Sequence, residues 1–343
     1  MHHFDWSLNC GFESLDHLLR FRDGKDTLRP MLQPLGFGFE VELGTRDWWF
    51  GGYSNIHYQE PRFNQGLAAR WIPLDPADFP DHVRARKARG LATIFQTEWT
   101  FVEYISHFGW NLGSLHAAIA FDAGPDGFQV RDRMHNNHPW FTEDGYGTVP
   151  ARVYRPAFDR RLTVLDYELS EPADTWESEF RAVLEVSAAE MWGGPGFPDH
   201  GPHLHLAGGL AGIEYAIDTF AHFAPRYSAD SQVRMLLGIR LVDCIRTLMG
   251  DRLRLLKAAR QLQPDDGSGQ PGADFLRALT EAGRHWRRAR KAFAAAGAAD
   301  SPRLDLAADA LRAVLPYERA AADAAAAWAK EFHHQLDTKG EPA

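Results

Sequence analysis

The chain has little cysteine and no long apolar run. Only two cysteines, Cys10 and Cys244, occur in 343 residues, and their separation fits no metal-binding or redox spacing. No segment approaches the roughly 20 apolar residues that span a bilayer, and residues 1–24 contain no apolar stretch typical of a secretion signal. These absences predict a soluble protein of the reduced cytoplasm with no membrane partner.

Positive charge is also scarce. The chain carries 37 Lys and Arg against 46 Asp and Glu, a net charge of -9. Nucleic-acid binding normally rests on clustered Lys and Arg, so this balance predicts no nucleic-acid partner. Two local basic stretches, 82–90 and 284–293, are interpreted as solvated helix faces.

The composition and the apolar spacing of the chain change near residue 170. The first part is rich in aromatics, Gly and Pro, and its apolar runs lack the regular βα alternation of a parallel sheet. It therefore predicts a mainly antiparallel sheet. The strands are expected at 37–44, 98–108, 113–122, 151–156 and 161–170.

The second part has the spacing of helices. Helices are expected at 174–192, 206–223 and 229–262, and a helical pair follows the Gly/Pro-rich linker 263–273. The predicted fold class is thus α+β: residues 1–172 form the sheet region, 173–338 a helical region that can pack with it, and 339–343 a tail. The apolar seam 233–250 is assigned to core packing, and a homodimer is left open.

Paired acidic side chains stand out in "GFGFEVEL" (36–43). Side chains alternate along a strand, so Glu40 and Glu42 share one face while Phe39 and Val41 share the other. Two carboxylates on a buried face repel and lose hydration, and arginines, open water or divalent metal ions can compensate.

Three further segments carry candidate site residues. In "LTVLDYELSEP", Asp166 and Glu168 share a strand face. In "DHGPHLHLAGG", the His203 and His205 pair has the H-x-H spacing common in metal sites. His116 lies in the apolar "GSLHAAIAF", where a packed core histidine is the simpler interpretation.

The order of these motifs resembles the amidoligase and glutamate–cysteine ligase relatives of glutamine synthetase. "GFEVE", "DYELSEP" and "GPHLHL" are similar to three metal- and nucleotide-binding strands of that superfamily. The resemblance implies a curved antiparallel sheet that binds ATP and Mg²⁺, with Glu40, Glu42 and Glu168 as metal ligands. It also implies His203, supported by His205, at a metal or the phosphates.

A second alignment with the superfamily uses His116 as the histidine strand, Arg152 or Arg155 at the transferring phosphoryl group, and "LDYEL" as the late carboxylate strand. The first alignment lacks the superfamily's late "E-F-R" strand, because the chain after His205 is helical in pattern. Both alignments imply a ligase that joins a small carboxylate to an amine through an acyl phosphate.

Two alternatives remain open. His200, His203 and His205, with a carboxylate such as Glu214, could bind Zn or Fe in a hydrolase or oxygenase. The chain could instead be a non-enzymatic binding module for a small molecule or peptide. Acyl-enzyme hydrolysis is expected to be absent, since neither cysteine has an activating group close to it in the sequence.

Overall fold

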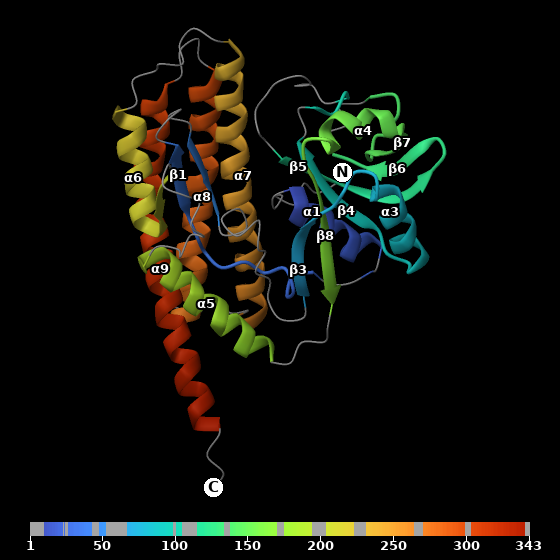
Figure 1. Cartoon of the computed structure of the whole chain (residues 1–343). Coiled ribbons are helices and arrows are strands. Elements are labelled where there is room, and N and C mark those ends of the chain that lie inside the picture. The colour runs from blue at the N-terminus through green and yellow to red at the C-terminus, as the bar shows by residue number, and fades with distance from the viewer. Residues whose placement is uncertain are drawn as a thin grey trace.

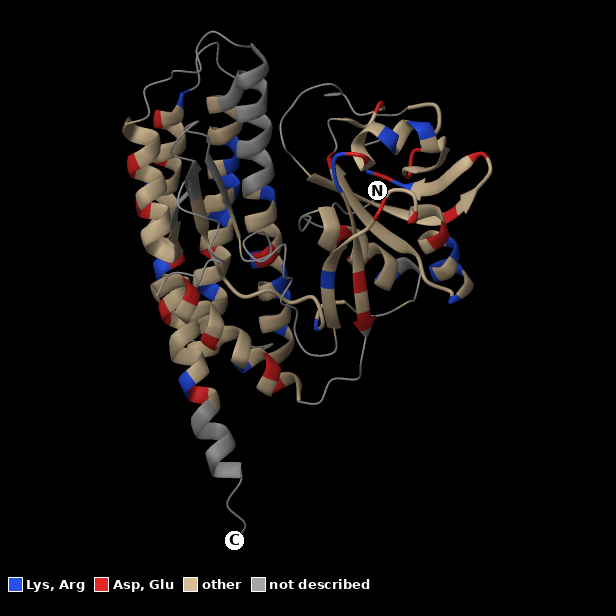
Figure 2. Ribbon diagram, viewed as in Figure 1, with Lys and Arg blue, Asp and Glu red and all other residues tan. Residues whose placement is uncertain are grey.

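The computed structural model combines a large antiparallel sheet with a bundle of long helices (Figure 1). It describes residues 10–22, 24, 27–42, 48–52, 67–98, 101–104, 115–133, 138–169, 175–193, 204–222, 231–263, 270–298 and 303–339. Within these ranges, no helix is long and apolar enough to cross a membrane. Figure 2 shows acidic and basic residues spread over both the sheet and the helices.

The large sheet has six strands in the order β3-β8-β4-β5-β6-β7, and all neighbouring pairs are antiparallel. Its central strands β4 and β5 are buried along most of their length. The strands are β3 (Leu67–Pro73), β4 (Thr93–Glu98), β5 (Leu115–Gly124), β6 (Gly127–Arg131), β7 (Tyr146–Val149) and β8 (Leu162–Leu169).

Helices cover both faces of this sheet. Helix α1 (Cys10–His17) and the π-helical turn η1 (Leu18–Arg22) lie on one face, whereas α3 (Phe79–Ala88) and α4 (Ala151–Phe158) lie on the other. Alternate side chains of β5 point to opposite faces of the sheet. Ala117 and Ile119 join the core under α1, whereas Ala118 and Ala120 join the core under α3 and α4.

A second, three-stranded sheet lies among the C-terminal helices, with the order β2-β1-β9. Its strands are β1 (Gly38–Glu42), β2 (Trp48–Gly51) and β9 (Leu204–Gly208). The helices are α5 (Trp176–Gly193), α6 (Gly209–His222), α7 (Ser231–Leu262), α8 (Pro271–Ala298) and α9 (Leu304–Lys339). The extensive α8–α9 and α7–α8 packing makes these helices one bundle.

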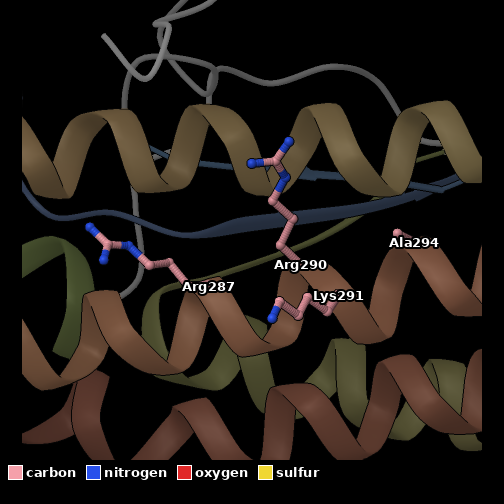
Figure 3. A pocket seen from close by; sticks show the side chains of 4 residues that line it. All are labelled: Arg287, Arg290, Lys291 and Ala294. Carbon is pink, nitrogen blue, oxygen red and sulfur yellow. The ribbon is translucent and has the colours of Figure 1, made fainter. Parts of the chain in front are cut away.

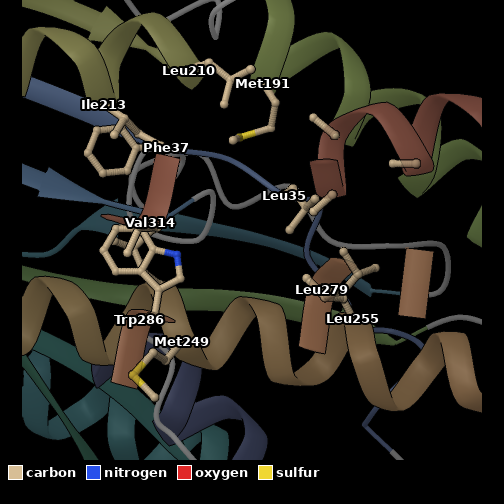
Figure 4. Packing of buried hydrophobic residues seen from close by; sticks show 14 of the residues in the cluster. Leu35, Phe37, Met191, Leu210, Ile213, Met249, Leu255, Leu279, Trp286 and Val314 are labelled. Carbon is tan, nitrogen blue, oxygen red and sulfur yellow. The ribbon is translucent and has the colours of Figure 1, made fainter. Parts of the chain in front are cut away.

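The bundle core is apolar around one buried ion pair. Figure 4 shows Phe37 and Trp286 packed among Leu, Ile and Met side chains. Arg252 is buried and donates from Nη2 to Glu318 Oε2 (2.7 Å), and Trp286 Nε1 donates to the same carboxylate. Two charges at this depth are tolerated because each satisfies the other's hydrogen bonds.

Two predicted strands are wrong, and both lie near the large sheet. Residues 151–156 form most of helix α4, whose buried Val153, Tyr154, Ala157 and Phe158 follow a helical spacing. The predicted strand 98–108 fails at residues 101–104, which form a turn after β4, and residues 99–100 and 105–108 lie outside the described part of the chain. The expected strands within 37–44, 113–122 and 161–170 are confirmed as β1, β5 and β8.

The α+β class is confirmed, but the packing crosses the boundary predicted at residue 172. Leu28, Leu35, Phe37 and Phe39 belong to the core of the helical bundle, and β1 pairs with β9 over five residues. The predicted helix 206–223 begins as β9 and becomes helical at Gly209. Chain segments on both sides of the boundary therefore complete one bundle core.

Candidate active site at Cys10, His116 and Asp132

Cys10 is the first residue of α1 and lies against the start of β5. The backbone N–H of Ala117 donates a hydrogen bond to Cys10 Sγ over 3.2 Å, and Ser14 Oγ donates to the Cys10 carbonyl over 2.8 Å. The cysteine is half-buried and free of any disulfide. The hydrogen bond from the Ala117 N–H stabilises a negatively charged thiolate.

His116 and Asp132 come from neighbouring strands of the large sheet. The register of β5 and β6 pairs Ile119 with Arg131, so the next residue, Asp132, lies beside Ala118. His116 is two positions along β5 on the same face, which makes it a diagonal neighbour of Asp132. The atoms His116 Nε2 and Asp132 Oδ1 are 2.7 Å apart, and both side chains are buried.

Tyrosines hold Asp132 from the other side. Tyr104 donates its hydroxyl hydrogen to Asp132 Oδ2 over 2.5 Å, and the Tyr104 and Tyr154 hydroxyl oxygens are 2.7 Å apart. Burial and the adjacent Asp132 charge raise the pKa of both tyrosines well above 10, so the hydroxyls keep their protons. Each oxygen of Asp132 therefore has a partner, and the carboxylate is fixed toward His116.

The pKa shifts of Cys10 and His116 favour an ion pair. Burial by itself acts to lower the pKa of His116, but the charge of Asp132, its hydrogen bond and the contact with Cys10 raise that pKa to about 10. Burial acts to raise the pKa of the Cys10 thiol, whereas His116, the Ala117 N–H and the charge of Arg246 bring it below its usual value of 9.0. The lowered pKa of the thiol and the raised pKa of the imidazole both favour a thiolate beside an imidazolium.

The three side chains have the arrangement of a nucleophile, a base and an orienting acid. Nε2 of His116 is engaged by Asp132, and the imidazole and the Cys10 thiol are close enough for each to shift the pKa of the other. A base that is itself oriented by a third group is the recurrent arrangement of nucleophilic acyl transfer.

The other predicted residues do not gather at this site. Glu40 and Glu42 lie on β1, and their side chains are outside the described part of the structure. The backbone register places His205 opposite Val41, not opposite either glutamate. Glu168 is exposed on β8 in the other sheet, so the predicted ligand strands β1 and β8 are not neighbours.

The predicted arginines and the remaining histidines are also separate from it. Arg155 pairs with Asp159 on α4, and Arg152 lies 3.9 Å from Glu103; all of these side chains are exposed. His200 and His203 lie outside the described residues. Glu214, from the alternative histidine site, pairs with Arg319 on the bundle surface (3.1 Å).

Metal ligands do not cluster in the described part of the chain, where no group of three or more His, Cys, Asp and Glu side chains could hold a metal ion. The side chains of Glu40, Glu42 and His205, and residue His203, lie outside that part.

Neither Cys10 nor Asp132 stands out in the sequence, because the partners of each are distant along the chain. His116 is 106 positions away from Cys10 in the chain and comes close to it because α1 packs against β5. The available signal was Cys-Gly at the start of an amphipathic stretch, then a histidine strand, a Gly-containing turn and a strand ending in Asp. A cysteine with His and Asp elsewhere in a sequence is a candidate nucleophile.

The basic stretch 284–293 lies on α8, as the helical pattern predicts. Figure 3 shows Arg287, Arg290 and Lys291 extending around a hollow of about 360 Å³ that Ala294 also lines. Among the described residues that line this hollow, none is a nucleophile or an acid.

Comparisons with known proteins identify no relative: no family model and no curated protein matches this chain.

Proposed function

We propose that the protein is a cysteine-dependent acyl-transfer enzyme that cleaves an amide bond through a thioester intermediate. The observation that carries this proposal is the contact chain from Cys10 through His116 to Asp132, with 2.7 Å between the imidazole and the carboxylate. An electrostatically fixed thiolate next to a protonated imidazole combines the nucleophile and the acid that amide cleavage needs.

The first half-reaction uses the thiolate and the imidazolium together. Cys10 Sγ attacks the carbonyl carbon of the substrate amide, and the electron pair of the C=O bond moves to its oxygen. The oxyanion then collapses, the C–N bond breaks, and His116 donates its Nδ1 proton to the leaving amine.

The second half-reaction regenerates the cysteine. Neutral His116 removes a proton from a water molecule, whose oxygen attacks the thioester carbonyl carbon. The C–S bond breaks, the acid product leaves, and the thiolate–imidazolium pair is restored. Asp132 keeps its negative charge throughout and stabilises the imidazolium form of His116.

Alkylation of the full-length protein tests the proposal without knowledge of the substrate. Iodoacetamide at pH 6 is expected to label Cys10 much faster than Cys244, as measured by mass spectrometry of the two cysteine peptides. Cys10→Ser should abolish the fast phase, and His116→Ala should slow it by raising the pKa of the thiol. Equal, slow labelling of both cysteines in the wild type would refute the thiolate on which the proposal rests.

The ATP- and Mg²⁺-dependent ligase stays a prediction of the sequence resemblance. It rests on Glu40, Glu42 and Glu168, and the placement of their strands in different sheets gives it less support than the cysteine site has. Its test is the thermal shift with ATP, with and without Mg²⁺, on the wild type and Glu40→Gln. A Mg²⁺-dependent shift that the variant loses would favour the ligase.

The other sequence predictions keep the same status. Zn or Fe bound at the histidine segment, a non-enzymatic binding role, a homodimer, a curved sheet and a cytoplasmic location each remain predictions. Metal analysis of the purified protein decides the first, because Zn or Fe that copurifies and is lost with His203→Ala would favour the histidine site.

A further inference from the structure

Helix α7 of the bundle contacts the helix that carries the nucleophile. Figure 1 shows α7 on the side of the bundle that faces α1 and the large sheet. Arg254 of α7 places Nη2 3.0 Å from Asp16 Oδ1 of α1, and the exposed fractions of these side chains are only 8% and 12%. This buried ion pair joins the two parts of the molecule one and a half turns after Cys10.

Asp16 has further partners that keep it fixed. Thr27 Oγ1 donates to Asp16 Oδ1 over 2.5 Å, and Arg20 Nε lies 3.1 Å from the same oxygen. Thr27 and Arg20 still contact Asp16 when Arg254 is replaced. The replacement can therefore shift α1 without leaving the Asp16 carboxylate unpaired.

A second arginine of α7 lies near the nucleophile itself. Arg246 is close enough to act on the charge of Cys10 and on that of Arg133, which forms an ion pair with Glu13 of α1. Arg246 precedes Arg254 by about 12 Å along α7, and Cys10 precedes Asp16 by about 9 Å along α1. Arg246 and Cys10 therefore lie at similar distances from the Arg254–Asp16 ion pair along their own helices.

We propose that α7 completes the active site, with Arg254 positioning the helix of Cys10 through its ion pair with Asp16 and bringing the charge of Arg246 toward the cysteine. This inference rests on the proposed cysteine chemistry and adds a role for the helical bundle. Neither arginine touches the reacting atoms, so both are positioning residues. The large sheet then carries the triad, and the bundle sets how much of the cysteine is in its reactive form.

The pH at which Cys10 becomes a thiolate depends on the charged groups around it. His116 faces Cys10 from β5 and Arg246 faces it from α7, while Arg133 and Glu13 neighbour Arg246 from the loop after β6 and from α1. Removal of Arg246 leaves His116 in place. The thiolate should therefore persist but require a higher pH.

The experiment is the pH dependence of Cys10 alkylation by iodoacetamide in full-length Arg246→Met. We expect the midpoint to rise by half to one pH unit, which lowers the labelling rate near pH 6 by about three- to tenfold. Arg260→Met, an exposed change on the same helix, is the matched control and should leave the profile unchanged.

Arg254 is tested by a conservative pair of variants. Arg254→Met should slow labelling of Cys10 several-fold at all pH values, and Arg254→Lys should restore a substantial part of the rate, because an ammonium group can still pair with Asp16. Unchanged profiles in Arg246→Met and Arg254→Met, with a reactive wild type, would overturn the role of α7. An unreactive wild type would instead overturn the proposed function itself.

Discussion

Replacement of Asp132 by asparagine removes one charge from the buried centre of the site and keeps the shape of the side chain. The wild-type carboxylate is 2% exposed and lies 2.7 Å from His116 Nε2. Its amide counterpart can still accept the hydrogen bond from Nε2. The Tyr104 hydroxyl can turn toward Tyr154, whose oxygen is 2.7 Å away, so the variant should fold.

The expected effect follows from the balance of forces on His116. Burial acts to lower the pKa of this histidine, and Asp132 is the main reason that the pKa rises from 6.5 to about 10. Without the negative charge, burial dominates and the imidazole is neutral at pH 7. Cys10 then loses its cationic partner, so burial raises the pKa of its thiol, and activity should fall on the order of 10³-fold.

The assay is the rate of Cys10 alkylation between pH 5 and 10. In the wild type the rate should rise through a midpoint below 9.0 and then stay level, because the thiolate–imidazolium pair persists until His116 loses its proton near pH 10. In Asp132→Asn the rise should move above 9.0. Asp122→Asn, an ion-pair partner of Lys87 outside the triad, is the control. An unchanged midpoint in Asp132→Asn would refute the electrostatic reasoning.

Three further changes have defined outcomes. Tyr104→Phe removes the hydrogen bond to Asp132 and should cost about 1–2 kcal/mol of unfolding free energy, measured by urea denaturation, with only a few-fold loss of Cys10 reactivity. Glu318→Ala leaves Arg252 as an uncompensated buried charge, and a loss of less than about 3 kcal/mol in the same assay would contradict the buried pair. Gly209→Ala should lower the melting temperature, because φ is +59° and a Cβ would meet a backbone carbonyl oxygen of α5 at 2.3 Å; an unchanged melting curve would argue against that approach.

The sequence predicts well those elements in which the spacing of apolar side chains matches the layers that bury them. Along β5, alternate residues serve two different apolar layers, and the five helices of the bundle have long, regular apolar faces. The failure at 151–156 has the opposite cause. That segment is short, and its aromatic and β-branched residues favour a strand, but contacts of Tyr154 and Phe158 with the sheet stabilise a helix.

The sequence by itself determined the α+β class, the change of composition and apolar spacing near residue 170 and the presence of His116 in an apolar strand. Those properties depend on local composition and on periods of a few residues, which a chain displays directly. Only the tertiary structure decided that Cys10, His116 and Asp132 meet, and that β1 and β8 belong to different sheets. Strand order and helix docking are set by packing between distant segments, and one sequence carries no direct record of those contacts.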